Sequence, residues 1–106
     1  MVAINQIKKF SRQIGEQFGA EQVILFGSHA RGRATADADV DLLVIGSFKG
    51  RSADKSVEIR MKLRPKFPVD IIVKTTEKVR QRIKMGDCFM QEILEKGKVL
   101  YEAHNR

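Results

Sequence analysis

The sequence predicts an α/β (α+β) fold in which a mixed β-sheet of about four strands packs with helices. Three short, strongly apolar runs rich in β-branched residues alternate with stretches of helical periodicity. This alternation is typical of a sheet covered by helices, and we expect the cover to lie mainly on one side. A chain of 106 residues can bury one core, so we expect a single domain over residues 1–106.

β-Strands are predicted where apolar residues run continuously between turn-forming residues. The predicted strands cover residues 22–26, 40–46, 69–75 and 98–102. Pro65 and Pro68 fix the entry to the third strand, and Gly97 precedes the fourth.

Helices are predicted where apolar side chains recur at helical spacing. The predicted helices cover residues 3–18, 52–63 and 76–96, with a short helix or turn at 28–35. Gly19 ends the first helix, and Thr76 gives the third only a weak cap. The third helix is expected to break at Met85–Gly86 and to restart with Asp87 as its N-cap.

The charge balance favours an anionic partner. Lysine and arginine total 20 against 13 acidic residues, a net charge of +7, which suits a nucleic acid, a nucleotide or an acidic protein. Much of the excess lies in residues 49–66, where a solvated helix face is the more usual explanation. Aromatic residues make up only 7% of the chain and tryptophan is absent, so stacking on single-stranded nucleic acid is not favoured.

The cellular setting is predicted from what the chain does not contain. No stretch approaches the roughly 18 apolar residues of a membrane span, so we expect a soluble, cytoplasmic protein without a membrane partner. The single cysteine, Cys88, lies in a helical apolar pattern, and we expect a buried, reduced thiol.

Three aspartates are the candidate chemical centre. Residues two apart on a strand share a face, so Asp39 and Asp41 project together at the start of the second strand. Such a pair calls for a neutralising cation, and Mg²⁺ prefers carboxylate oxygens. Asp70 interrupts the apolar third strand and joins the pair if that strand lies beside the second. It could then bind metal and accept a proton from an attacking hydroxyl. Two ions held in this way suit an in-line phosphoryl or nucleotidyl displacement.

The turn after the first strand is the candidate phosphate site. Gly27 permits close backbone approach, a following short helix would direct N–H groups at an anion, and Ser28 can donate a hydrogen bond. Arg31 and Arg33 could neutralise a polyphosphate. Each feature also has an ordinary structural explanation: a plain turn, solvated aspartates, or an ion pair between Asp70 and a lysine such as Lys74. Their combination favours a metal site.

The same residues resemble the signature of a known family. Gly27-Ser28-His29-Ala30-Arg31-Gly32, then five residues, then Ala38-Asp39-Val40-Asp41-Leu42 resembles the motif of the minimal nucleotidyltransferase family. That family belongs to the DNA polymerase β-type nucleotidyltransferase superfamily. The resemblance extends over essentially the whole chain. One departure is Ala38, which stands where the family commonly has serine.

The resemblance implies a polymerase β-like fold, two Mg²⁺ ions, and transfer of a nucleoside monophosphate, most often AMP from ATP, to an acceptor hydroxyl. It assigns Asp39, Asp41 and Asp70 as catalytic carboxylates and metal ligands, and Gly27, Ser28 and Arg31 as nucleotide-binding residues.

The resemblance also suggests an acceptor. Larger members carry an added helical domain for the acceptor, and the present chain ends four residues after its last expected strand. Compact members are often antitoxins that adenylylate a small helical HEPN-type toxin, or neutralise it by binding. We therefore expect a toxin protein as acceptor. Two alternatives stay open: a non-catalytic antitoxin or nucleic-acid-binding module, and a small-molecule nucleotidyltransferase whose pocket a homo-oligomer completes.

Overall fold

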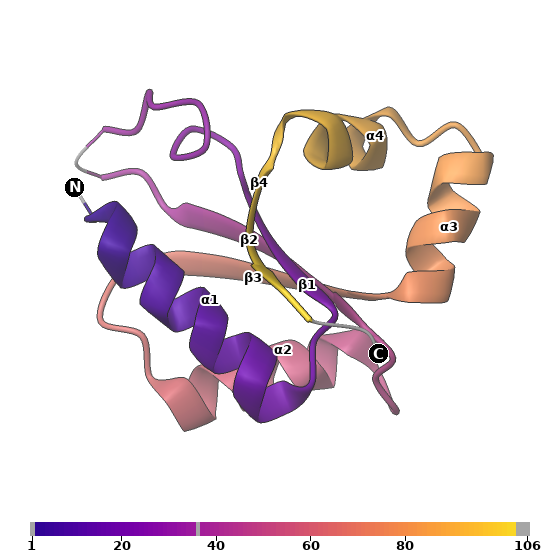
Figure 1. The fold of residues 1–106 in the computed structure, drawn as a ribbon, viewed down its shortest axis with the longest axis horizontal. Helices are drawn as coiled ribbons and strands as arrows, with labels where there is room; N and C mark the ends of the chain where they lie inside the picture. Colours follow the sequence, from indigo (N-terminus) through magenta and orange to yellow (C-terminus); the bar gives the residue numbers. More distant parts are fainter. Residues whose placement is uncertain (1, 36, 104–106) are drawn as a thin grey trace.

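The computed structural model describes residues 2–35 and 37–103, and within these ranges it contains four helices and four strands (Figure 1). In chain order they are α1 (Ile4–Phe18), β1 (Gln22–Phe26), β2 (Val40–Gly46), α2 (Ser52–Leu63), β3 (Val69–Thr75), α3 (Thr76–Lys84), α4 (Cys88–Lys96) and β4 (Lys98–Glu102). All four strands have the predicted bounds. Over the described residues, every helix is too short or too polar to cross a membrane.

The strands form one mixed sheet in the order β3-β2-β1-β4. β1 pairs antiparallel with both β2 and β4, while β2 and β3 run parallel. The predicted mixed four-stranded sheet is therefore confirmed. β2 and β3 can be parallel because α2 carries the chain back across one side of the sheet between them.

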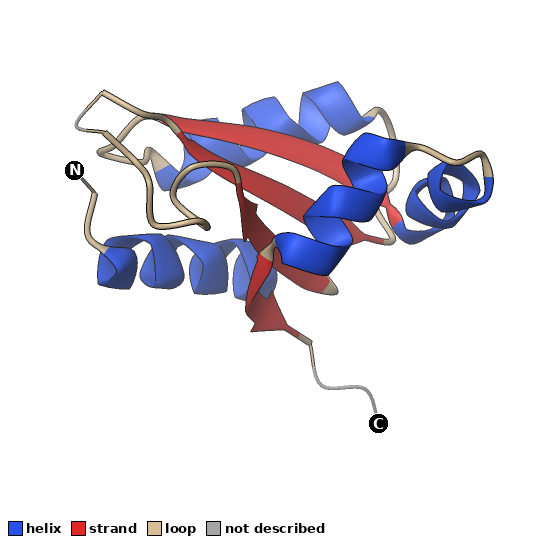
Figure 2. Ribbon diagram, turned by 90° about the horizontal axis from the view of Figure 1, so that it is seen from above, coloured by secondary structure: helices blue, strands red, loops and turns tan. Residues whose placement is uncertain are grey.

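Helices cover both faces of the sheet (Figure 2), so the expectation of cover mainly on one side is wrong. Alternate residues of β2 explain this arrangement. Val40, Leu42 and Val44 pack towards α1 and α2, in the larger core cluster. Leu43 and Ile45 pack in a second cluster with Val79 of α3 and with Met90 and Ile93 of α4. We call these sides the α1/α2 face and the α3/α4 face. A strand buried on both faces is apolar at nearly every position.

Two local expectations are corrected, and one that was left open is decided. Residues 28–35, expected as a short helix or a turn, contain turns, in which the N–H groups of Ala30 and Arg31 both donate to Gly27 O and that of Arg33 donates to Ser28 O. The cap of α3 is Thr75, whose side chain accepts from Lys78 N, where Thr76 was expected.

Cys88 is exposed, where a buried thiol was expected. Met90 and Ile93 form the buried stripe of α4, and Cys88 lies two residues, or about 200°, from Met90 around the helix. The apolar pattern alone did not indicate which side of α4 faces the sheet.

Candidate active site

The three predicted carboxylates come from one end of β2 and β3 and share the α3/α4 face. Asp39 and Asp41 are separated from Leu43 by an even number of positions, so their side chains project from the same face as Leu43. Asp70 shares a face with Ile72 for the same reason. Asp41 is the direct register partner of Asp70 across the parallel pair, where adjacent strands lie about 4.8 Å apart. The structure therefore brings Asp41 and Asp70 side by side, with Asp39 at the entry to β2.

The site lies where the helical cover of this face ends. α3 and α4 pack over Leu43 and Ile45, whereas Asp39 and Asp70 are exposed and Asp41 is half-buried. One end of this face of the sheet is thus buried under α3 and α4, and the other end presents the carboxylates to solvent.

The electrostatic environment of Asp41 is unfavourable to its charge. Burial raises the pKa of this carboxyl, the charges of Asp70 and then Asp39 raise it further, and His29 acts in the opposite direction. Among the described residues, no lysine or arginine forms an ion pair with any of the three aspartates. The alternative of an ordinary Asp70–Lys74 pair is therefore not seen.

α2 holds the strand that carries Asp70. Ser56 Oγ donates to Ile71 O and Arg60 Nη2 donates to Val69 O, each at 2.8 Å. These carbonyls belong to the residues on either side of Asp70, so both backbone neighbours of the carboxylate are fixed from α2. Sequence reasoning assigned α2 only a basic, solvated face and did not indicate this contact.

Gly27 occupies a position that disfavours every other residue. Its φ is +76°, in the left-handed region, and a Cβ placed there would collide with Asp41 Oδ2. This contact follows from the antiparallel register, in which Phe26 lies opposite Asp41. The close approach of a phosphate to Gly27 stays a prediction, and in the structure the group beside Gly27 is the Asp41 carboxylate.

His29 links the Gly27 turn to the first aspartate, and sequence reasoning missed this role. Its Nδ1 lies 3.1 Å from the backbone oxygen of Asp39. Because a carbonyl oxygen can only accept, Nδ1 carries the proton in this contact. The other ring nitrogen, Nε2, is buried and has no partner among the described residues. His29 occupies the variable position of the predicted motif, which gave no signal of its function.

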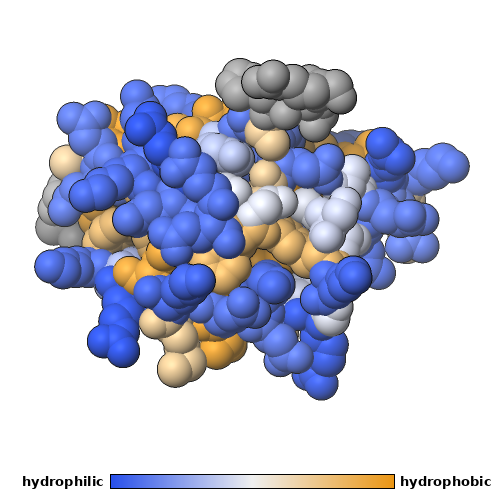
Figure 3. Space-filling model, turned by 60° about the horizontal axis from the view of Figure 1, so that its bottom comes forward, coloured by the Kyte–Doolittle hydropathy of each residue, from blue (hydrophilic) through white to orange (hydrophobic). Residues whose placement is uncertain are grey.

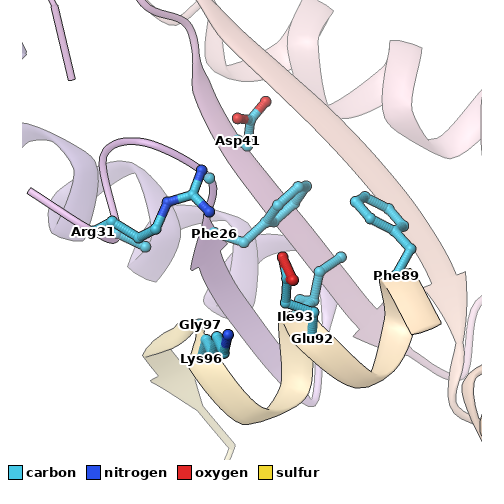
Figure 4. Close-up of a pocket in the computed structure, with 10 residues that line it drawn as sticks. Phe26, Arg31, Asp41, Phe89, Glu92, Ile93, Lys96 and Gly97 are labelled. Atoms are coloured by element: carbon cyan, nitrogen blue, oxygen red, sulfur yellow. The ribbon is translucent and has the colours of Figure 1, made fainter. Parts of the chain in front are cut away.

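A cavity of about 240 Å³ opens beside Asp41 (Figure 4). Phe26, Gly27 and Arg31 line it from β1 and the following turn, and α4 contributes Phe89, Glu92 and Lys96. Ser28 does not line this cavity. The contribution of α4 was not predicted, because it depends on how a helix 60 residues further along packs on the sheet.

The donor set fits Mg²⁺ in its chemistry. It consists of carboxylate oxygens without competing cationic partners, on a pair of strands where like charges interact. Within residues 2–35 and 37–103, no three side chains of metal-ligand type already lie close enough together to hold an ion. Rotation of the exposed Asp39 and Asp70 side chains towards Asp41 is therefore required to complete a shared site.

A glycine turn in the left-handed region, an adjoining arginine and neighbouring carboxylates on a mixed sheet are compatible with an enzyme that transfers nucleotidyl groups. The chain belongs to the nucleotidyltransferase domain family, whose sequence profile matches residues 5–101.

Individual relatives agree with this class. A candidate protein adenylyltransferase of Methanocaldococcus jannaschii is 33% identical over 99 residues, which are 90% of this chain and 94% of that protein. A candidate nucleotidyltransferase of Sulfolobus solfataricus superposes with a TM-score of 0.64 at 20% identity, over 93% of this chain and 79% of that one. A toxin–antitoxin structure with AMP-PNP superposes with a TM-score of 0.52 at 18% identity, over 97% of this chain and 76% of that one. At these identities the two solved structures establish the fold.

Proposed function

We propose that this nucleotidyltransferase is Mg²⁺-dependent and transfers AMP from ATP to a hydroxyl of a partner protein. The observation that carries the proposal is the register of β2 and β3, which sets Asp41 beside Asp70 next to the Gly27 turn. Metal-bridged carboxylates beside a phosphate-binding turn suit an in-line displacement at phosphorus.

Each residue has a proposed role. Asp39 and Asp41 hold Mg²⁺, which when bound neutralises charge on the phosphates. The Gly27–Ser28 turn and Arg31 bind the triphosphate, since backbone N–H groups and guanidinium suit phosphate oxygens. Asp70 holds metal and accepts the proton of the acceptor hydroxyl. The acceptor oxygen forms a bond to the α-phosphorus while the bond from that phosphorus to pyrophosphate breaks.

A protein acceptor is supported by the Methanocaldococcus jannaschii relative, which is described as a candidate protein adenylyltransferase and matches over nearly its whole length. The toxin–antitoxin assemblies that share the fold support an antitoxin role. We propose a small helical toxin of the HEPN type as the partner, modified on an exposed hydroxyl.

The test is transfer of label from α-labelled ATP, with Mg²⁺, to the product of the neighbouring gene. Wild-type protein and Asp37→Asn should label it, whereas Asp39→Asn, Asp41→Asn and Asp70→Asn should not. Asp37 is the matched control, because it is an exposed aspartate of the same loop outside the carboxylate group. Label that persists in Asp39→Asn and Asp41→Asn would contradict the proposal.

A contact-only antitoxin is the second candidate, favoured by the basic surface. The side that carries α1 and α2 is largely hydrophilic (Figure 3), and Arg51, Lys62 and Lys66 are exposed there. This surface lies on the α1/α2 face, away from the carboxylates. If alanine at all three aspartates left toxin neutralisation intact, binding alone would be sufficient.

A further inference from the structure

We propose that the purine base of the nucleotide stacks on Phe89, at the end of the cavity away from Arg31. This inference rests on the proposed function and adds a base-recognition residue to it. Phe89 is the second residue of α4 and lies about 50 residues from the aspartates of β2 in the sequence.

Phe89 is a large apolar side chain with no core to fill. It is 55% exposed, whereas Met90 and Ile93 of the same helix are 3% exposed and complete the packing of α4 on the sheet. Its ring meets that of Phe26 edge to face, with centroids 5.8 Å apart and planes at 83°. This contact fixes the orientation of the Phe89 ring and leaves ring surface free for an aromatic ligand.

The order of side chains along the cavity matches the order of groups in a nucleoside triphosphate. In Figure 4, Arg31 and Lys96 lie on one side of Phe26, Phe89 lies on the other, and Asp41 stands between them. A triphosphate tail directed at the two cations, with its α-phosphorus at Asp41, places the base towards Phe89.

Size and polarity limit what this end can accept. The whole cavity is about 240 Å³, below the roughly 300–1,000 Å³ of a typical small-molecule site, so it encloses only part of a nucleoside triphosphate and leaves the rest open to solvent. A purine offers more surface for stacking than a pyrimidine. Glu92, three residues after Phe89 and thus on the same side of α4, can accept a hydrogen bond from an exocyclic amino group such as that of adenine.

The experiment compares a ligand that carries a nucleoside on its triphosphate with one that is a triphosphate only. Binding of AMP-PNP and of inorganic tripolyphosphate, both with Mg²⁺, is measured by calorimetry for wild type, Phe89→Ala and Leu94→Ala. Phe89→Ala should weaken AMP-PNP binding about 5- to 150-fold, the usual range for loss of one base–aromatic stack, and leave tripolyphosphate binding unchanged. Leu94 is the control, since it is an exposed residue of α4 that lines a different groove.

A gain-of-signal variant provides a second readout. The chain contains no tryptophan, so Phe89→Trp introduces a single fluorophore at the proposed platform. Its affinity for AMP-PNP should stay within a few fold of wild type, and AMP-PNP should change its emission while tripolyphosphate should not.

The outcomes separate the two proposals. Binding of neither ligand by wild type would contradict the proposed function itself. Binding of both, with equal AMP-PNP affinity in wild type and Phe89→Ala, would overturn only the stacking role. If that variant instead lost binding to the partner protein alone, Phe89 would belong to a protein interface and the inference would be wrong.

Discussion

A Cβ on Gly27 would collide with Asp41 Oδ2, so a side chain at this turn would have to displace the carboxylate. A glycine at the end of β1 therefore determines where the carboxylate of β2 can stand. β1 and β2 are hydrogen-bonded neighbours with Phe26 opposite Asp41, so sheet register brings Asp41 next to the turn that begins at Gly27.

Gly27→Ala should abolish nucleotidyl transfer and destabilise the protein, because the new methyl group displaces Asp41. Gly32→Ala is the matched control. Gly32 also has a positive φ, +69°, yet a Cβ there meets nothing within 4 Å. Both variants should lose about 1–2 kcal/mol of stability from left-handed strain, and only Gly27→Ala should also lose transfer. Thermal unfolding and the labelling assay measure the two effects, and equal transfer by both variants would contradict the contact.

Asp41→Asn should stabilise the metal-free protein at neutral pH. The folded state raises the pKa of Asp41 through burial and the charges of Asp70 and Asp39. The folded protein therefore holds that proton more tightly than the unfolded chain does. Protonated Asp41 therefore contributes to the free energy of unfolding. This contribution is fully present below the pKa of an aspartate in the unfolded chain, near 3.9, and is lost as the pH rises through the pKa of Asp41 in the folded protein. With EDTA present, the melting temperature of wild type should fall relative to that of Asp41→Asn as the pH rises from the unfolded-state pKa to the folded-state pKa of Asp41.

Mg²⁺ should reverse this loss in wild type. Metal and proton compete for the same carboxylate, so the rise in melting temperature on adding Mg²⁺ should grow as pH passes upward through the folded pKa of Asp41. Asp41→Asn should show little response, while the control Asp37→Asn should respond like wild type. A pH-independent response in wild type would place the ion elsewhere.

His29 should act through Asp39. Its Nδ1–H bond to the Asp39 carbonyl holds the backbone that carries the carboxylate. His29→Leu should raise the Mg²⁺ concentration needed for half-maximal AMP-PNP binding about 10- to 100-fold, the range usual for loss of a group that orients a metal ligand. His29→Asn can place an amide N–H near the position of Nδ1 and should recover part of the loss. Equal defects in the two variants would indicate a packing role only.

The hydrogen bond from Ser56 should contribute to stability. Ser56→Ala removes the donor to Ile71 O, and we expect a loss of about 0.5–1.5 kcal/mol in the free energy of unfolding. Ser47→Ala, at an exposed position, should change it by less than about 0.5 kcal/mol. Urea unfolding of the two variants makes the comparison. No difference between them would show that water replaces the hydroxyl at this sheet edge.

Much of this molecule is predictable from local sequence. Three of the strand bounds follow from strongly apolar runs and the fourth from the stop at Gly97, and the carboxylate pair follows from the two-residue period of a strand. The placements of His29, Phe89 and Cys88 could not be predicted from local sequence. Each depends on which side of a turn or helix packs against the sheet, and that is decided by contacts far away in the chain. The alternative of a short helix or a turn after Gly27 could not be decided from the sequence; the structure has turns there, because the helical bonds to Gly27 O are not continued along the chain.

The division of the α3/α4 face into dry core and open carboxylates has a consequence for how the chain tolerates change. Asp41 and Leu43 point the same way only because an even number of steps separates them. Loss or gain of one residue at the start of β2 would turn the carboxylates towards α1 and α2 and bring Val40 to the surface. The carboxylates and the core residues of β2 therefore depend on one register, and neither set can change face without the other.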